Sequence, residues 1–239
     1  MAGTIESVFR YLEYKIGLTK DALIQQKDIL AKSEPGAIFD VGANIGDTTA
    51  AYTKYFPKSV IYSFEPFADS YNKLMMRFAD NPMVKPFQLA IANRTTSMDF
   101  YSLAVSGANS LLPVAKGAEK WSEPPSGMSV NNIVKVEVTT IDKFCKNQGI
   151  DHIMILKMDI QGGELLALEG AREMLSRKAI SLIYSELLFV PLYNGQAEYY
   201  QVCEVLSRFG YSLFNIYDSH CDSTGRIKWC DGIFAASGI

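Results

Sequence analysis

Two hydrophobic patterns alternate along this chain from residue 37 onward. Short, nearly continuous apolar runs are typical of buried parallel strands, and apolar residues spaced three to four apart are typical of helices. Strands are predicted at 37–41, 59–65, 84–91, 97–103, 133–140, 152–160, 179–187, 211–218 and 232–236, and helices at 47–56, 69–79, 141–149, 163–177 and 197–210.

This alternation predicts an α/β fold: a doubly wound, mostly parallel, seven-stranded Rossmann-like sheet. The last two strands, 211–218 and 232–236, are close enough in sequence to form an antiparallel terminal hairpin. In such sheets, ligands bind at the carboxyl ends of the parallel strands. Residues 102–132 lack a clear period and contain three prolines, so they predict either a lid over that edge or a disordered insertion.

The first thirty or so residues have a helical pattern, with Val8, Leu12 and Ile16 four apart. The stretch KSEPG at 32–36 breaks this pattern. We therefore expect an N-terminal helical extension over residues 1–35 and a main domain over residues 36–239.

The composition of the chain argues against several classes of protein. The chain has 239 residues, 48% hydrophobic, with a net charge of -3, so no nucleic-acid partner is expected. No apolar run is long enough for a membrane span, and the N-terminal residues carry charges where a signal peptide needs an apolar stretch. The four cysteines form no C-x-x-C pair, which favours free thiols and a cytoplasmic location.

A glycine-containing turn, FDVGANIGDTT, follows the first predicted strand. Relative to a dinucleotide fingerprint, Asn44 replaces the middle glycine and Asp47 the third. Asp47 and Asp40 would repel a pyrophosphate and would favour a cationic ligand such as S-adenosylmethionine (SAM), which carries an ammonium and a sulfonium. We expect Asp40 to act on that ammonium directly or through the turn. The small residues that allow close approach are Gly42, Ala43 and Gly46.

Acids also stand at the ends of later strands. Glu65, followed by Pro66, has the spacing of a ribose-binding acid, which suits NAD as well as SAM. Asp159 and Glu186 end two buried strands that we expect to be adjacent. Such carboxylates could act as a general base on a substrate hydroxyl or could bind a divalent cation such as Mg²⁺, and the sequence leaves both open.

Three further residues are candidates at the substrate. His220 lies between the two closing strands and is a minor candidate for the base. Glu164 is a first-turn acid that the helix dipole favours, and it is also a candidate contact of the substrate. Tyr193 is a candidate for stacking on the acceptor.

These stretches resemble the FkbM-type SAM-dependent methyltransferases. The matching motifs are FDVGANIGDTT, SFEP at 63–66, NSLL at 109–112, VEVTTIDKF at 136–144 and, most specifically, LKMDIQGGELLALEGA at 156–171. The resemblance covers roughly residues 37–236 and implies a class I methyltransferase fold. One departure is Gln161, where many members have an acid. The positions that the resemblance places near the cofactor are Asp40, Gly42, Asn44, Gly46, Glu65, Ser110 and Asp159.

The leading interpretation is a SAM-dependent O-methyltransferase that acts on a hydroxyl of a sugar, a glycan or a small natural product. The stretch from residue 184 to 234 is similar to members that act on glycans. Two alternatives stay open: an NAD(P)-dependent oxidoreductase and a non-catalytic SAM-binding domain. A divalent cation is optional, and a homo-oligomer is possible.

Overall fold

The computed structural model describes residues 21–236. Residues 1–20, which include Val8, Leu12 and Ile16 of the predicted extension, and residues 237–239 lie outside the described part. The described end of that extension is α2 (Ala22–Ile29), in which Asp21 caps the amino end by accepting a hydrogen bond from the backbone N–H of Leu23. Within residues 21–236, no helix is long and apolar enough to cross a membrane.

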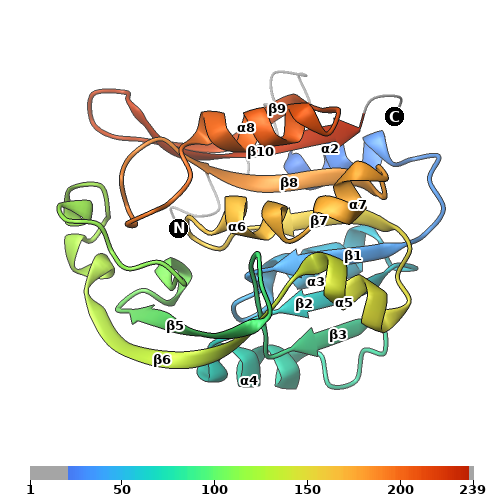
Figure 1. Ribbon diagram of the computed structural model, residues 1–239, viewed down its shortest axis with the longest axis horizontal. Helices are drawn as coiled ribbons and strands as arrows, with labels where there is room; N and C mark the ends of the chain where they lie inside the picture. Colours follow the sequence, from blue (N-terminus) through green and yellow to red (C-terminus); the bar gives the residue numbers. More distant parts are fainter. Residues whose placement is uncertain (1–20, 237–239) are drawn as a thin grey trace, which may run out of the picture.

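A seven-stranded sheet forms the centre of the molecule (Figure 1), and the prediction of its class is confirmed. Five strands are parallel, and β10 runs antiparallel to both β8 and β9. The strand order is β3 (Val84–Phe87), β2 (Val60–Phe64), β1 (Ala37–Val41), β7 (Ile153–Met158), β8 (Ile180–Leu188), β10 (Ile227–Ala236) and β9 (Tyr211–Cys221).

Helices cover both faces of this sheet. On one face α2 and α3 (Asp47–Tyr55) pack over Ile38, Ile61 and Ile155. Helix α4 (Ala68–Arg77) contacts the edge strand β3. Four helices pack on the other face. The four are α5 (Ile141–Gln148), α6 (Glu164–Glu169), α7 (Arg172–Ser176) and α8 (Tyr199–Arg208).

The prediction of one helix over 163–177 is wrong, because the chain breaks into α6 and α7 at Gly170. A Cβ atom at Gly170 would lie 2.1 Å from the carbonyl oxygen of Ala92. A glycine here lets the helix end against a neighbouring backbone.

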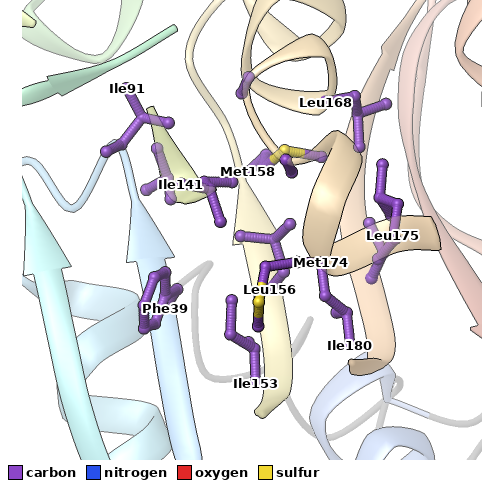
Figure 2. Close-up of a cluster of buried hydrophobic side chains, with 14 of the residues drawn as sticks. Phe39, Ile91, Ile141, Ile153, Leu156, Met158, Leu168, Met174, Leu175 and Ile180 are labelled. Carbon is purple, nitrogen blue, oxygen red and sulfur yellow. The ribbon is translucent and has the colours of Figure 1, made fainter. Parts of the chain in front are cut away.

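The larger buried cluster lies between β7 and the helices α5 to α8. In Figure 2, Leu156 and Met158 of β7 face Leu168 and Met174 of the covering helices. Each side chain of this size contributes roughly 1.5–3 kcal/mol when it is fully buried. This packing fixes the end of β7, from which Asp159 projects.

A second, three-stranded sheet stands beside the carboxyl ends of the main strands (Figure 1). Its order is β4 (Ala90–Ile91), β6 (Val130–Thr139) and β5 (Thr96–Leu103). The predicted strand at 84–91 is therefore two strands, with β3 in the main sheet and β4 in the small one.

Residues 104–129 connect β5 to β6, and we call them the covering segment. They fold into three short 3-10 helices, η1 (Ser106–Ala108), η2 (Ala118–Lys120) and η3 (Pro125–Met128). Ala118 and Met128 are buried against Leu188 and Val190 at the end of β8. Of the two predictions for this region, the structure therefore favours the lid.

Candidate active site

A cavity of about 590 Å³, including its open mouth, lies at the carboxyl ends of β1, β2 and β7. The turns after these strands form one side, with Asn44, Glu65 and Asp159 among the lining residues. The small sheet and the covering segment form the opposite wall, with Leu89, Ala90, Ile91, Phe100, Ser106, Gly107, Asn109 and Leu111.

The turn after β1 touches the turn after β7. Gly42 has a φ of 78°, and a Cβ atom there would lie 1.9 Å from the carbonyl oxygen of Asp159, so a side chain is excluded. Asn44 also has a positive φ, 46°. Its backbone N–H donates to Glu65 Oε2 at 2.9 Å, while its own Oδ1 is buried and accepts no hydrogen bond from the described residues. An acceptor is therefore free for a ligand.

Glu65 is buried at the cavity wall. Its two carboxylate oxygens accept one backbone N–H each, from Asn44 and from Phe67, both at 2.9 Å. Burial is the largest cause that raises the pKa of Glu65 to about 7. Each oxygen keeps a further lone pair, so the carboxylate can accept both hydroxyls of a ribose.

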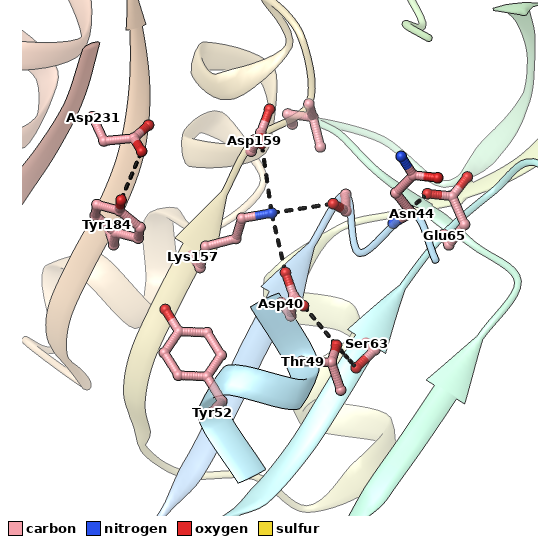
Figure 3. A network of polar contacts seen from close by, with 12 residues as sticks. Asp40, Asn44, Thr49, Tyr52, Ser63, Glu65, Lys157, Asp159, Tyr184 and Asp231 are labelled. Atoms are coloured by element: carbon pink, nitrogen blue, oxygen red, sulfur yellow. Dashed lines mark hydrogen bonds and ion pairs between the residues drawn. The ribbon is translucent and has the colours of Figure 1, made fainter. Parts of the chain in front are cut away.

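Asp40 is fully buried and does not line the cavity. Its Oδ1 lies 3.1 Å from Lys157 Nζ, and its Oδ2 accepts a 2.6 Å hydrogen bond from Thr49 (Figure 3). Burial lowers the pKa of Lys157, but the attraction of Asp40 and Asp159 outweighs burial and raises it. Lys157 Nζ also donates to the carbonyl of Gly42 at 3.1 Å. Asp40 therefore acts on the turn through Lys157.

The second acid of the turn is paired as well. Asp47 lies 2.6 Å from Arg77, which also donates to the carbonyl of Ile45. The interpretation of Asp40 and Asp47 as free charges that repel a pyrophosphate is therefore wrong, because a cation compensates each. Among the residues that line the cavity, the ionisable ones are Glu65 and Asp159.

Asp159 projects from the end of β7 and keeps 45% of its side chain exposed. Its Oδ1 accepts a 2.8 Å hydrogen bond from Gln161 Nε2. The same Nε2 atom donates to Glu186 Oε2 at 3.0 Å. One amide group thus bridges the two carboxylates that the sequence identified, and Asp159 is the one that lines the cavity.

Glu186 lies behind this amide and is buried. Burial, followed by the charge of Asp159, raises its pKa well above the ordinary value. Since amide hydrogens lie between the two carboxylates, the site as built does not fit a resident divalent cation. Within residues 21–236, no group of three or more His, Cys, Asp or Glu side chains could hold a metal ion.

Two other candidates, Ser110 and Tyr193, hold the loops together. Ser110 Oγ donates to the carbonyl of Gln161 at 2.8 Å. The hydroxyl of Tyr193 lies within hydrogen-bonding distance of Gln161 Oε1, 2.9 Å, and of the carbonyl of Ala108, 2.8 Å. Both side chains are buried and tie the covering segment to the turn after β7. Tyr193 therefore offers no open face for stacking.

The remaining predicted positions also have structural contacts. Glu164 is buried, accepts the backbone N–H of Ile160 at 2.9 Å, and has a pKa that burial raises to about 7. Gly46 begins α3 with a φ of 88°, and Ala43 is buried beneath the turn. Pro66 lines the cavity beside Glu65.

The placement of His220 in a loop is wrong. Strand β9 continues to Cys221, so His220 lies within it and pairs with Trp229 of β10. The two rings stack with centroids 5.0 Å apart. His220 is not among the residues that line the cavity.

Sequence reasoning did not single out Lys157, which organises the turn. The signal was present: Lys157 and Asp40 each stand one residue before the last residue of their strands, and neighbouring parallel strands place them side by side. An isolated lysine in an otherwise apolar buried strand needs such a partner.

A seven-stranded sheet with an antiparallel final pair, and a cavity at the carboxyl ends of its parallel strands, defines the class I methyltransferase fold. The chain belongs to the FkbM methyltransferase family, whose domain model matches residues 40–213. It is a SAM-dependent methyltransferase, and the oxidoreductase interpretation is set aside.

Three methyltransferases are similar to this chain. The 2-O-methyltransferase NoeI of Sinorhizobium fredii is 24% identical over 193 residues, covering 76% of this chain and 74% of NoeI. Methyltransferase sdnD of Sordaria araneosa is 27% identical over 158 residues, covering 57% of this chain and 60% of sdnD. The solved structure of the bifunctional kinase-methyltransferase WbdD has 12% identity and a TM-score of 0.48, covering 90% of this chain and 38% of that one.

Proposed function

We propose that this methyltransferase transfers the methyl group of SAM to a hydroxyl of a sugar, a glycan or a small natural product. The observation that carries the proposal is the cavity lining, in which two carboxylates, Glu65 and Asp159, occur without a lysine, arginine or histidine. Such a lining favours a cationic cofactor over a pyrophosphate.

The chain's own residues fit SAM. Glu65 would accept the ribose hydroxyls, and the unpartnered Oδ1 of Asn44 would accept an N–H or O–H of the cofactor. Leu89, Ile91 and Phe100 offer an apolar wall for a flat base. When bound, SAM supplies an electrophilic methyl group on a positively charged sulfur.

Asp159 lines the cavity with part of its side chain exposed, which supports a role as the proton acceptor. Bound SAM would supply the methyl group, and the acceptor hydroxyl would pass its proton to Asp159 as its oxygen gains that methyl group. Gln161 holds this carboxylate in place, and burial raises the pKa of Glu186 behind it. The covering segment closes the other wall and limits the access of water.

The similarity to a relative named a 2-O-methyltransferase supports transfer to oxygen. The four cysteines are free, which supports a reducing, cytoplasmic location.

Transfer of labelled methyl from SAM to a panel of saccharides and small hydroxylated products tests the proposal. We expect labelled product with the native chain and at least a hundredfold less with Asp159→Asn, while both still bind S-adenosylhomocysteine (SAH). Full turnover by Asp159→Asn would show that Asp159 is not the base. Label recovered only on nitrogen or carbon would disprove O-methylation.

A further inference from the structure

A second hollow lies next to the cofactor cavity. It measures about 840 Å³ including its open side and runs between the first turns of α4 and the ends of β5 and β6 nearest the covering segment. We call it the α4 groove. Ser106 lines both spaces, and Ile45, which lines the groove, directly follows Asn44 of the cavity.

Two stacked aromatic rings connect the two spaces. Phe67 lines the groove and Phe100 lines the cavity, with ring centroids 6.4 Å apart and planes 25° apart. Because Phe100 supports it, the Phe67 ring is held in place and can present an apolar surface to a ligand in the groove. Sugar rings pack their C–H faces on such aromatic surfaces.

Two serine hydroxyls of the groove lack partners. Ser70 and Ser102 are 4% and 6% exposed, and neither side chain makes a hydrogen bond with any of the residues 21–236. Buried polar groups nearly always have a partner in protein or water. Neither serine oxygen is fully buried, so both hydroxyls are open to water or to a ligand in the hollow and can donate or accept hydrogen bonds there.

The remaining polar lining suits a neutral ligand. Asp69 and Lys73 carry opposite charges, so the groove has no excess charge to attract a phosphate or a nucleic acid. Asn131 is exposed and its amide provides both donors and an acceptor. Phe67 begins α4 without a side-chain cap, which leaves backbone N–H groups of the first turn as further donors.

We propose that the α4 groove is a saccharide subsite, which holds an outer sugar of an extended, neutral glycan while a hydroxyl of the same glycan is methylated at the cavity. This rests on the proposed function, and it specifies an oligosaccharide as the acceptor. Phe67 packs on the sugar ring, and Ser70, Ser102 and Asn131 bond its hydroxyls.

The test uses a variant that fills the groove, Asn131→Trp, and a matched control, Asn147→Trp, at an exposed asparagine of α5. Binding of chitotetraose, cellotetraose and maltotetraose is measured by saturation-transfer NMR in the presence of SAH. We expect the native chain and Asn147→Trp to bind at least one tetrasaccharide, and Asn131→Trp to bind it at least tenfold more weakly. The double variant Ser70→Ala/Ser102→Ala should lose about three- to tenfold, with SAH affinity unchanged throughout.

Equal tetrasaccharide binding by Asn131→Trp and the native chain would overturn the subsite, as would a native chain that binds none of the three. Methyl transfer separates this result from failure of the proposed function. If a monosaccharide and a tetrasaccharide are both methylated and Asn131→Trp changes neither rate, the groove assignment fails and O-methylation stands. If the native chain labels no hydroxyl, the proposed function fails.

Discussion

The Nζ atom of Lys157 lies 3.1 Å from Oδ1 of Asp40, and both side chains are buried between neighbouring strands. This pair stands directly beneath the turn that begins the cofactor cavity, because the same Nζ atom donates to the carbonyl of Gly42. The geometry of the turn therefore depends on a charge pair that does not itself line the cavity.

Removing one partner of this pair should destabilise the protein strongly. For Lys157→Met we expect a loss of about 3–5 kcal/mol in the free energy of unfolding, since Asp40 is left buried without its cation. Arg77→Met breaks the exposed pair with Asp47 and should cost less than about 1 kcal/mol. Denaturant titration measures both, and similar small losses in the two variants would contradict the expectation.

Cofactor affinity should depend on the ionisation of Glu65, whose pKa is about 7. The ionised carboxylate accepts both ribose hydroxyls, so SAH affinity should fall about tenfold as the pH drops from 8 to 6. Glu65→Gln should bind weakly without this pH dependence. Glu164→Gln is the control, because Glu164 has a similar pKa but does not line the cavity. Calorimetry across this pH range would reject the assignment if Glu65→Gln kept the native profile.

Gln161 should be needed for turnover more than for cofactor binding. Gln161→Met keeps the length of the side chain but removes the amide between Asp159 and Glu186. A misplaced base lowers the rate, by about 10- to 100-fold here, while SAH affinity changes less than about threefold. Gln148→Met on the exposed end of α5 should match the native chain. A loss of SAH binding in proportion to turnover would show that Gln161 mainly shapes the cofactor site.

Buried carboxyls should also make stability depend on pH. Burial raises the pKa of Glu164 from 4.5 to about 7, so between these values the folded protein holds a proton that the unfolded chain has lost. Its contribution is fully present below pH 4.5 and declines as the pH rises to 7, by at most about 1.4 kcal/mol per pH unit. Denaturant titrations of the native chain and Glu164→Gln from pH 4.5 to 7.5 should show this declining difference. A difference that grows with pH would contradict the sign.

The sequence predicted the sheet and the cavity edge well because both depend on local patterns. Continuous apolar runs predicted the buried strands, and the acids at the ends of those strands predicted the position of the cavity. The breaks at Gly170 and between β3 and β4 depend on contacts with distant backbone, which no local pattern contains.

The chemistry of the site was harder to predict, because charges were counted without their partners. Asp40 and Asp47 stand beside the turn in sequence, but Lys157 and Arg77 reach them from elsewhere in the chain. In the sequence, Gln161 stands out only as a position where many family members have an acid. The folded chain shows that its amide bridges Asp159 and Glu186.

The covering segment leaves and rejoins the small sheet at one place, where Leu103 pairs with Val130. Because both ends are anchored together, residues can be inserted between them or exchanged without shifting either strand, and doubling the length of such a loop costs only about 0.6 kcal/mol. The segment is thus a replaceable module. Grafting it between relatives would exchange one wall of the cavity while the turns after β1, β2 and β7 stay in place.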